Sequence, residues 1–558
     1  MSILSRKPLN SLLAEADNSE KGLKRTLSAT SLVALGIGAI IGAGLFSITG
    51  GAAANNAGPA ITISFVLAAL GCVFAGLCYA EFASMIPVAG SAYTYSYATL
   101  GEFIAWVIGW DLVLEYAVGA ATVSISWSRY LVKFLGYFDL SLPPQLTMSP
   151  FDTLTMADGS IVSGMINLPA VFIIIVISLV LVKGTRESAV VNSIIVALKL
   201  CVVLIFIFLG WGYINTDNYT PYIPTNSGVF GEFGFSGIAR AAAIVFFAYI
   251  GFDAVSTAAQ EAKNPKRDMP IGILVSLLIC TVLYILFAHV MTGVAHYTAF
   301  QGQDGIAPVA VAIDHMGDPD ANGVIQPAYP WLNKAIILAI LGGYASVILV
   351  MLMGQSRVFF SMSKDGLLPK VFSDIHPKFS TPAKSNIMFM VFVSIFAAFV
   401  PARVVGEMTS IGTLFAFILV CIGVIVMRRS MPDAPRAFRT PLVPLIPVLG
   451  VGTCLFMMVF LPFDTWIRLI AWMIIGLDVY LFYGLNHSHF KSKSITTMDY
   501  KVCATSGLVL ALLLAFFAYL HGIDNPEDKG LLIFSYGLSV IHVVVYLMYY
   551  FKKPKASV

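Results

Sequence analysis

Long apolar segments separated by short polar ones follow one another from residue 31 to the end of the chain. Fourteen of them are long enough to cross about 30 Å of hydrocarbon as helices. The third is overlong, which predicts a strong tilt or an extra turn beyond the outer face. The pattern therefore predicts an all-α integral membrane protein with fourteen transmembrane helices. They lie near 31–53, 58–85, 101–136, 166–183, 188–212, 236–260, 270–294, 332–360, 385–401, 405–427, 443–462, 465–486, 501–520 and 531–551.

Two of the predicted helices contain stretches that unwind readily. One is the glycine-rich run at 36–44, and the other is Phe-Phe-Ala-Tyr-Ile-Gly-Phe-Asp at 246–253. A break at membrane depth is costly, because the freed N–H and C=O groups find no water there. In secondary transporters, paired breaks direct half-helix N-termini at an anionic group and free carbonyls at a cation. An amino acid carries both charges, so the breaks predict an amino acid site.

The composition agrees with a membrane protein, since 58% of the residues are hydrophobic and 11% are charged. A soluble domain carries about 25% charged residues. With a cytoplasmic N-terminus, about three quarters of the lysines and arginines fall in cytoplasmic segments, as the positive-inside rule requires. Both termini are therefore predicted on the cytoplasmic side of the cell membrane. The net charge of +3 reflects this orientation and does not indicate a nucleic-acid partner.

Motifs for enzymatic chemistry are missing from the sequence. It contains no Gly-x-x-x-x-Gly-Lys-Ser/Thr, His-Glu-x-x-His or Cys-x-x-Cys string, so no ATP hydrolysis, cofactor or standard metal site is indicated. The seven cysteines lie in or at the ends of predicted helices, where they behave as small apolar residues. We therefore expect neither an enzyme nor a disulfide-linked accessory subunit. His289, His296 and His542 are interpreted as residues near helix ends, not as ligands.

Several strings along the chain are typical of one transporter family. They are 40–46 in the first predicted helix, 109–116 in the third, 246–256 with 261–265 at the sixth, and the cytoplasmic strings 361–369 and 428–441. With these strings the chain resembles the amino acid, polyamine and organocation superfamily, and within it the cationic amino acid transporter family. Fourteen helices are similar to the longer members of that family, which append two helices to the common twelve.

The resemblance implies a LeuT-like fold with two five-helix inverted repeats. These would lie at 31–213 and 236–428, within a transport core of residues 31–430. Residues 1–30 would form a cytoplasmic N-terminal segment, 431–551 would hold helices 11 to 14, and 552–558 would be a cytoplasmic tail.

Residues at the two breaks are predicted to bind the substrate. N–H groups around the first break would bind the carboxylate, as helix N-termini bind anions. Carbonyls at both breaks would accept from the α-ammonium, and Phe252 would close over the ligand. The alternative is that the glycines serve close helix packing and the phenylalanines are core or lipid-facing residues. The predicted set is Ile40, Gly42, Ala43, Gly44, Phe247, Ala248, Ile250 and Phe252.

Ionisable residues inside predicted helices are candidates for proton coupling, because a charge at membrane depth costs about 2.5 to 3.5 kcal/mol on insertion scales. Lys199 lies deep in the fifth helix, and in relatives a lysine at the matching position occupies the place of a sodium ion. Glu115 lies in the third helix with Asp111 one turn earlier, and Lys199 or the substrate could supply a cation to this acidic pair. Lys199 and Glu115 are the predicted coupling residues. Asp253 is interpreted as a residue that pins the resumed sixth helix, whereas Arg240 and Asp478 have no assigned partner.

The predicted function is secondary active transport of L-amino acids, driven by protons. Cationic substrates such as arginine, lysine and ornithine are favoured, with small neutral amino acids such as alanine as the alternative. A transporter-like amino acid sensor is the alternative from another class. The expected partners are the amino acid, protons and the lipid bilayer, and the oligomeric state is left open.

Overall fold

The computed structural model describes residues 3, 5–12, 27–88, 90–155, 159–184, 188–301, 307–319, 325–379, 381–489 and 496–552. These residues form a bundle of helices with two short antiparallel hairpins, β1–β2 and β3–β4. Most of the predicted segments 1–30 and 552–558 lie outside the described residues.

The first half of the chain holds helices that cover the first five predicted segments. Its first helix is broken into several pieces, and its third continues through a π-helical turn. The elements are α2 (Ala29–Ile40), η2 (Gly44–Ile48), α3 (Thr49–Ala52), η3 (Ala53–Ala57), η4 (Gly58–Ala60), α4 (Ile61–Met85), α5 (Ser91–Thr99), α6 (Glu102–Val113), η5 (Leu114–Val118), α7 (Gly119–Gly136), η6 (Pro144–Leu146), β1 (Thr153–Thr155), β2 (Ile161–Ser163), α8 (Leu168–Lys183), α9 (Ser188–Trp211) and η7 (Thr216–Tyr219).

The second half begins with another broken helix and ends with a long helical hairpin. The elements are α10 (Gly234–Val245), η8 (Phe246–Tyr249), α11 (Ala254–Thr257), η9 (Ala259–Glu261), α12 (Pro265–Val294), η10 (Tyr297–Phe300), α13 (Pro308–Asp314), β3 (Gly317–Pro319), β4 (Ile325–Pro327), α14 (Pro330–Lys364), η12 (Lys370–Phe372), α15 (Ala383–Phe399), α16 (Ala402–Ser430), α17 (Leu445–Val459), α18 (Phe463–Val479), η13 (Tyr480–Gly484), α19 (Leu485–His487), α20 (Thr497–Asp524) and α21 (Lys529–Tyr550).

Every predicted helix coincides with a helical stretch of the structure. Among the described residues, ten stretches are long and apolar enough to cross a membrane, while α8, α15 and α17 are shorter apolar helices. The overlong third prediction corresponds to the continuous stretch Glu102–Gly136, which has 35 residues. The chain is therefore an all-α, multi-pass membrane protein.

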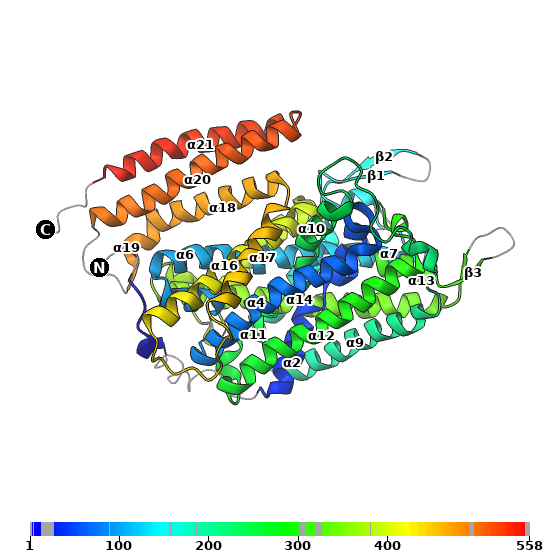
Figure 1. Ribbon diagram of the computed structural model, residues 1–558, viewed down its shortest axis with the longest axis horizontal. Helices are drawn as coiled ribbons and strands as arrows, with labels where there is room; N and C mark the ends of the chain where they lie inside the picture. Colours follow the sequence, from blue (N-terminus) through cyan, green and yellow to red (C-terminus); the bar gives the residue numbers. More distant parts are fainter. Residues whose placement is uncertain are drawn as a thin grey trace.

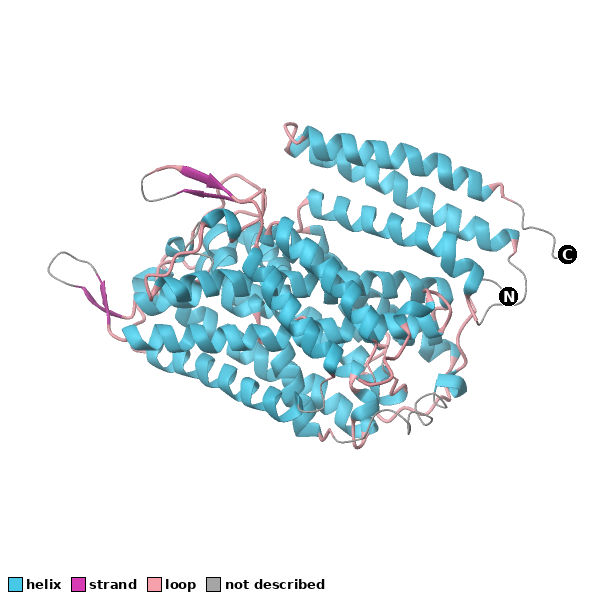
Figure 2. Ribbon diagram, turned by 180° about the vertical axis from the view of Figure 1, so that it is seen from behind, coloured by secondary structure: helices cyan, strands magenta, loops and turns pink. Residues whose placement is uncertain are grey.

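The helices lie roughly parallel, and α18, α20 and α21 form a separate layer along one side of the bundle (Figures 1 and 2). The two β hairpins project from the same end of the molecule (Figure 2). In the helical hairpin, α20 begins and α21 ends at the opposite end of the molecule (Figure 1). By the positive-inside assignment, the β hairpins mark the outer end of the bundle.

An N-terminal arm, formed by Ile3 and residues 5–12, packs against the end of the bundle opposite the β hairpins. The Phe103 N–H donates to the Ile3 carbonyl at 2.9 Å, which places the arm at the start of α6. The Lys7 ammonium pairs with Asp365, at the end of α14, at 2.8 Å. The Ile3 N–H donates to Asp499 in the first turn of α20. The arm thus connects the third and eighth predicted helices to the terminal hairpin.

The string 428–441 is held by one buried carboxylate, Glu81, near the end of α4. Arg428 donates to both oxygens of Glu81, at 2.7 and 2.9 Å. Arg436 lies 3.2 Å from the same carboxylate, and the Thr440 N–H donates to it at 2.8 Å. The string therefore wraps around Glu81 and fixes the end of α16 against α4.

Replacing Glu81 by glutamine leaves two guanidinium groups without their countercharge, and breaking a buried pair costs about 3 to 5 kcal/mol. We expect Glu81→Gln to lower the thermal unfolding temperature of the detergent-solubilised protein markedly. Asp374→Asn is the control, because it removes the exposed pair with Lys384, and exposed pairs contribute about 0 to 1 kcal/mol. Equal unfolding temperatures for the two variants would contradict the anchoring role of Glu81.

Candidate substrate site and coupling groups

The first helix is broken directly after Ile40. Ile41 has an extended backbone conformation (φ −73°, ψ 103°), and the chain resumes as the π-helical segment η2 at Gly44. The last carbonyls of α2 and the first N–H groups of the next segment therefore meet at residues 41–43. Such groups have no partner within their own helix.

The sixth predicted helix is broken between η8 and α11. Ile250 is extended (φ −59°, ψ 134°), and Gly251 has φ +117°, in the region that favours glycine. A Cβ atom at Gly251 would lie 2.9 Å from the backbone of Ala39. The second break thus lies against the end of α2.

The two breaks touch at a second point as well. A Cβ atom at Gly44 would lie 2.1 Å from the Ala248 Cα atom, so the two backbones are in direct contact there. A Cβ atom at Gly42 would lie 3.1 Å from a side-chain carbon of Val347 in α14. The structure therefore brings Ile40, Gly42, Ala43 and Gly44 together with Phe247, Ala248 and Ile250.

Tyr284 of α12 lies across both breaks. Its hydroxyl hydrogen-bonds to the Ile40 carbonyl at 2.8 Å and to the Ala248 carbonyl at 2.9 Å. These are two of the carbonyls that the sequence assigns to the α-ammonium of the substrate. The Phe247 carbonyl accepts from the Ile250 N–H at 3.2 Å. Sequence reasoning missed Tyr284, since a tyrosine in an apolar helix carries no signal of the carbonyls it reaches.

Phe252 lies in an aromatic cluster behind the second break. Its ring centroid is 5.8 Å from that of Tyr79 and 5.1 Å from that of Phe417, and the side chain is fully buried. This is the core-packing role that the sequence leaves open as the alternative to a gate.

On the outer side of the first break, tyrosines from two other helices hold η2. The Tyr130 hydroxyl of α7 donates to the Phe46 carbonyl, and the Tyr344 hydroxyl of α14 is 2.8 Å from the Ser47 hydroxyl. The two tyrosine rings pack edge to face, with centroids 5.6 Å apart. These contacts fix η2 directly after the first break.

Lys199 is buried beside the first break. Its ammonium donates to the Gly38 carbonyl at 2.7 Å, in the last turn of α2, and its aliphatic chain lies against Gly343. Cations are favoured at helix C-termini, where the carbonyls carry partial negative charge. The pairing of Lys199 with Glu115, which the sequence allows, does not occur in this structure.

Glu115 contacts Asp253 instead, across the interface between η5 and the second break. The Tyr116 hydroxyl donates to Asp253, which ties the sixth predicted helix to the third. Within the described part of the chain, neither Glu115 oxygen accepts a hydrogen bond from a donor group. Two ionised carboxylates in contact repel each other, so the pair requires a shared proton or a cation.

The two remaining intramembrane charges find partners away from the breaks. Arg240 donates to the carbonyls of Phe230 and Phe460, at 3.0 and 3.2 Å. Asp478 accepts from the Tyr546 hydroxyl and lies 2.9 Å from His542, both on α21. His542 is therefore an interior residue of its helix, which corrects its interpretation as a helix-end residue.

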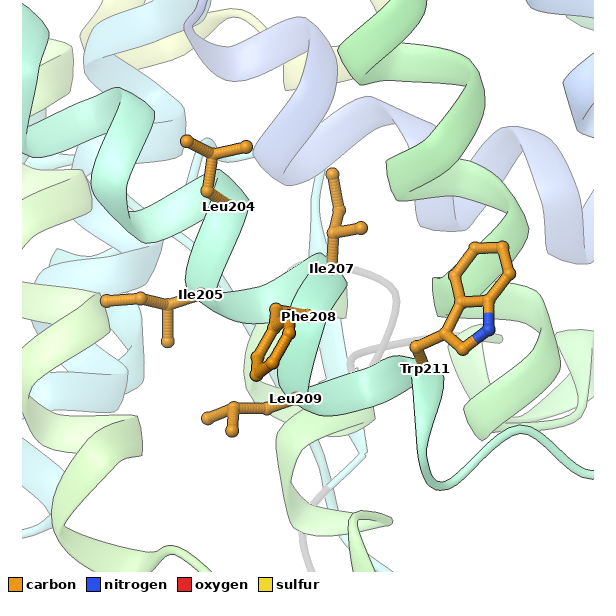
Figure 3. Close-up of a pocket in the computed structure, with 6 residues that line it drawn as sticks. All are labelled: Leu204, Ile205, Ile207, Phe208, Leu209 and Trp211. Carbon is orange, nitrogen blue, oxygen red and sulfur yellow. The ribbon is translucent and has the colours of Figure 1, made fainter.

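A cavity of about 700 Å³ lies on the outside of α9 and is distinct from the breaks. Figure 3 shows the side chains that line it, which project from this one helix: Leu204, Ile205, Ile207, Phe208, Leu209 and Trp211. The lining is apolar, and Phe208 is 82% exposed in the protein alone. Such a surface faces lipid, so the cavity is not the amino acid site. The described residues contain no group of three or more potential metal ligands.

Two broken helices in mutual contact within a multi-pass bundle are a feature of secondary transporters. The chain belongs to the amino acid permease family, whose model matches residues 27–478. This confirms the resemblance to the amino acid, polyamine and organocation superfamily. Members of this family are transporters, not enzymes.

Proteins that are similar to this chain are named after several different substrates. The chain is 45% identical to the branched-chain amino acid permease BcaP of Bacillus subtilis (strain 168), over 87% of this chain and 98% of that protein. It is 42% identical to the methylthioribose transporter of the same organism, over 87% and 99% of the two chains. It is 37% identical to the vacuolar cationic amino acid transporter 4 of Arabidopsis thaliana, over 77% and 68%.

Adding a methyl group at Gly44 forces the two breaks apart, because the new Cβ would overlap the Ala248 backbone. We expect Gly44→Ala to abolish amino acid uptake into cells that express the protein. Gly51→Ala is the matched control, since its Cβ would have no heavy atom within 4 Å. Normal uptake by Gly44→Ala at equal expression would refute the contact.

Removing the Tyr284 hydroxyl leaves the Ile40 and Ala248 carbonyls without their donor, which costs about 1 to 3 kcal/mol. We expect Tyr284→Phe to lower the thermal stability of the ligand-free protein and to increase its stabilisation by a bound amino acid. Tyr546→Phe serves as the control, because that hydroxyl binds Asp478 away from the breaks. Melting curves with and without L-arginine or L-valine test this, and equal ligand shifts in all variants would contradict it.

Proposed function

We propose that the protein is a proton-coupled amino acid permease of the cell membrane. The contact between two broken helices supports this proposal, because it gathers unpaired N–H groups and carbonyls at one point of the bundle. In the proposed arrangement all fourteen helical segments cross the bilayer, both termini are cytoplasmic, and helices 1 to 10 form a LeuT-like pair of inverted repeats.

The amino acid would bind at the breaks through its backbone groups. N–H groups at Gly42, Ala43 and Gly44 would hold the carboxylate, as at helix N-termini generally. The Ile40 and Ala248 carbonyls would accept from the α-ammonium, which requires the Tyr284 hydroxyl to leave them. The substrate would thus replace one donor that both breaks share in the present structure.

Proton coupling is assigned to Lys199 and to the pair formed by Glu115 and Asp253. The acidic pair is next to the second break, and Lys199 is bound to the end of α2 at the first break. A change in the protonation of either group would alter the forces on one half-helix. That is the requirement for linking proton movement to the opening of the site.

Cationic amino acids are the first candidates for the substrate. Glu115 and Asp253 are buried, and no basic side chain contacts them among the described residues. A substrate guanidinium or ammonium group would supply a countercharge to this acidic pair. Transporters with cationic amino acids in their names are among the relatives.

Branched-chain neutral amino acids are the second candidates. Val347 faces the first break, and Met351 and the Thr409 methyl group lie 3.3 Å from the Cβ position of Gly119. These apolar groups suit an aliphatic substrate side chain. A 45% identical relative is named a branched-chain amino acid permease.

The deciding experiment uses purified full-length protein in liposomes with an imposed inward proton gradient. Uptake of labelled L-arginine and labelled L-valine is measured with and without the gradient. Gradient-dependent uptake of either substrate supports the proposal, and the preferred substrate identifies the side-chain class. Binding of an amino acid without any flux would instead indicate a sensor.

Lys199→Met removes the charge but preserves much of the side-chain volume against Gly343. We expect this variant to lose the stimulation of uptake by the proton gradient, because the Gly38 carbonyl no longer has a titratable partner. Uptake is measured over a range of external pH values. A wild-type pH profile in this variant would eliminate Lys199 from the coupling mechanism.

A further inference from the structure

Asp111 is a fully buried carboxylic acid that has no role in the mechanism so far. It lies in α6, one turn on the cytoplasmic side of Glu115. Among the described residues, neither of its oxygens has a hydrogen-bond partner. A buried acid without a partner is costly, and inside a membrane protein it marks a functional site by default.

The surroundings of Asp111 are acidic or neutral. On its outward side lie Glu115, Tyr116 and Asp253. From α16 the facing residue is Gly412, whose Cβ position is 3.2 Å from the Asp111 Oδ1 atom. From α18, Trp472 stacks on Trp110.

The charged groups on the neighbouring helices are engaged elsewhere. Arg357 of α14 donates to Glu261 and to the Thr257 carbonyl. Glu407 and Arg428, near the two ends of α16, pair with Arg403 and Glu81, while Asp478 of α18 faces His542. Within the described residues, Asp111 thus has no basic neighbour that would keep it ionised.

Helix α14 runs antiparallel to this part of the third helix and presents another unpartnered group. Gly354 lies against the Tyr116 ring and Met362 against Gly109, so Gln355 is at the level of Glu115. Both polar atoms of the buried Gln355 amide lack partners within the described structure. Unpartnered polar groups gathered at one depth are typical of a site that holds water or a proton.

A separate polar network lies nearer the N-terminal arm, at the level of Gly109. The ring of Tyr93 from α5 is next to Gly109, with a ring carbon 3.0 Å from the Gly109 Cβ position. The Tyr93 hydroxyl donates to Asp365 at 2.7 Å, and Asp365 pairs with Lys7 of the N-terminal arm. This network begins at the level of Gly109, two residues before Asp111 in α6, and extends to the end of the bundle where the arm packs.

We propose that Asp111 is the inner proton-binding group of this transporter, which takes the proton from the pair formed by Glu115 and Asp253 and releases it towards the cytoplasm. This inference rests on the proposed proton coupling. Asp111, which its surroundings keep neutral, first gives its proton to water on the cytoplasmic side. The O–H bond of the Glu115 carboxyl group then breaks and a new O–H bond forms on the Asp111 carboxylate, directly or through one water molecule, so that Glu115 is left as a carboxylate.

The position of Glu115 and Asp111 suits this transfer. Residues four apart face the same side of a helix, with Cβ atoms about 5 to 6 Å apart. Glu115 lies in the π-helical segment η5, and such segments are frequent at functional sites.

Net uptake and exchange separate this role from a structural one. Net proton-driven uptake requires the proton to leave on the inner side, whereas exchange of internal for external amino acid at equal pH does not. In liposomes that contain a pH-sensitive dye, we expect Asp111→Asn to retain exchange of labelled substrate. Net uptake and the accompanying proton influx should fall by roughly a hundredfold, the lower range for a positioned proton-transfer group. Asp111→Glu, which restores a carboxyl group, should recover part of both.

Asp478→Asn is the matched control, because it alters a membrane-embedded carboxylate that binds His542 outside this cluster. It should change neither assay. Wild-type net uptake and proton influx in Asp111→Asn, or equal losses of exchange and net uptake, would overturn the role of Asp111. If Glu115→Gln and the unmodified protein both transport without proton influx, the proposed coupling itself fails, which is a distinguishable result.

Discussion

Backbone groups freed at membrane depth must find partners inside the protein, and this constraint organises the centre of the molecule. The two breaks satisfy this constraint by contacting each other. Gly44 and Gly251 allow backbone to approach backbone, and Tyr284 supplies one hydroxyl to a carbonyl of each break. The two half-helices are consequently joined through few atoms, which a bound amino acid can replace.

Buried charges divide into two groups according to whether the protein provides a partner. Glu81 holds two arginines, and Lys199 is bound to a helix-terminal carbonyl. Glu102 lies at a helix N-terminus and accepts from three hydroxyl groups. Partners of this kind stabilise one arrangement. The acids next to the second break lack basic partners in the described structure, and that distinction points to them as the groups that change state.

The terminal hairpin and the N-terminal arm are connected to each other and to the bundle by hydrogen bonds and an ion pair. Asp478 binds two residues of α21, and Asp499 of α20 accepts from Ile3 of the arm. The arm in turn reaches Asp365 through Lys7, at the C-terminal end of α14. The terminal hairpin of α20 and α21 is therefore connected, through the arm, to the end of α14.

Much of the fold could be predicted from the sequence, because hydrocarbon demands about 20 consecutive apolar residues from every spanning helix. That demand fixes helix positions locally, and the overlong third helix was predicted for the same reason. The basic residues predict the orientation, and the glycines at 36–44 mark the first break.

What the sequence determined by itself is thus the set of helices and the places where two of them break, while their orientation stays a prediction. Only the tertiary structure decided that Lys199 binds Gly38 rather than Glu115, that Glu115 faces Asp253, and that Tyr284 joins the breaks. These contacts join residues far apart in the chain, and nearly uniform hydrophobicity around a membrane helix does not show which face meets which neighbour. Which residue each buried polar side chain contacts is therefore decided by the packing of the helices.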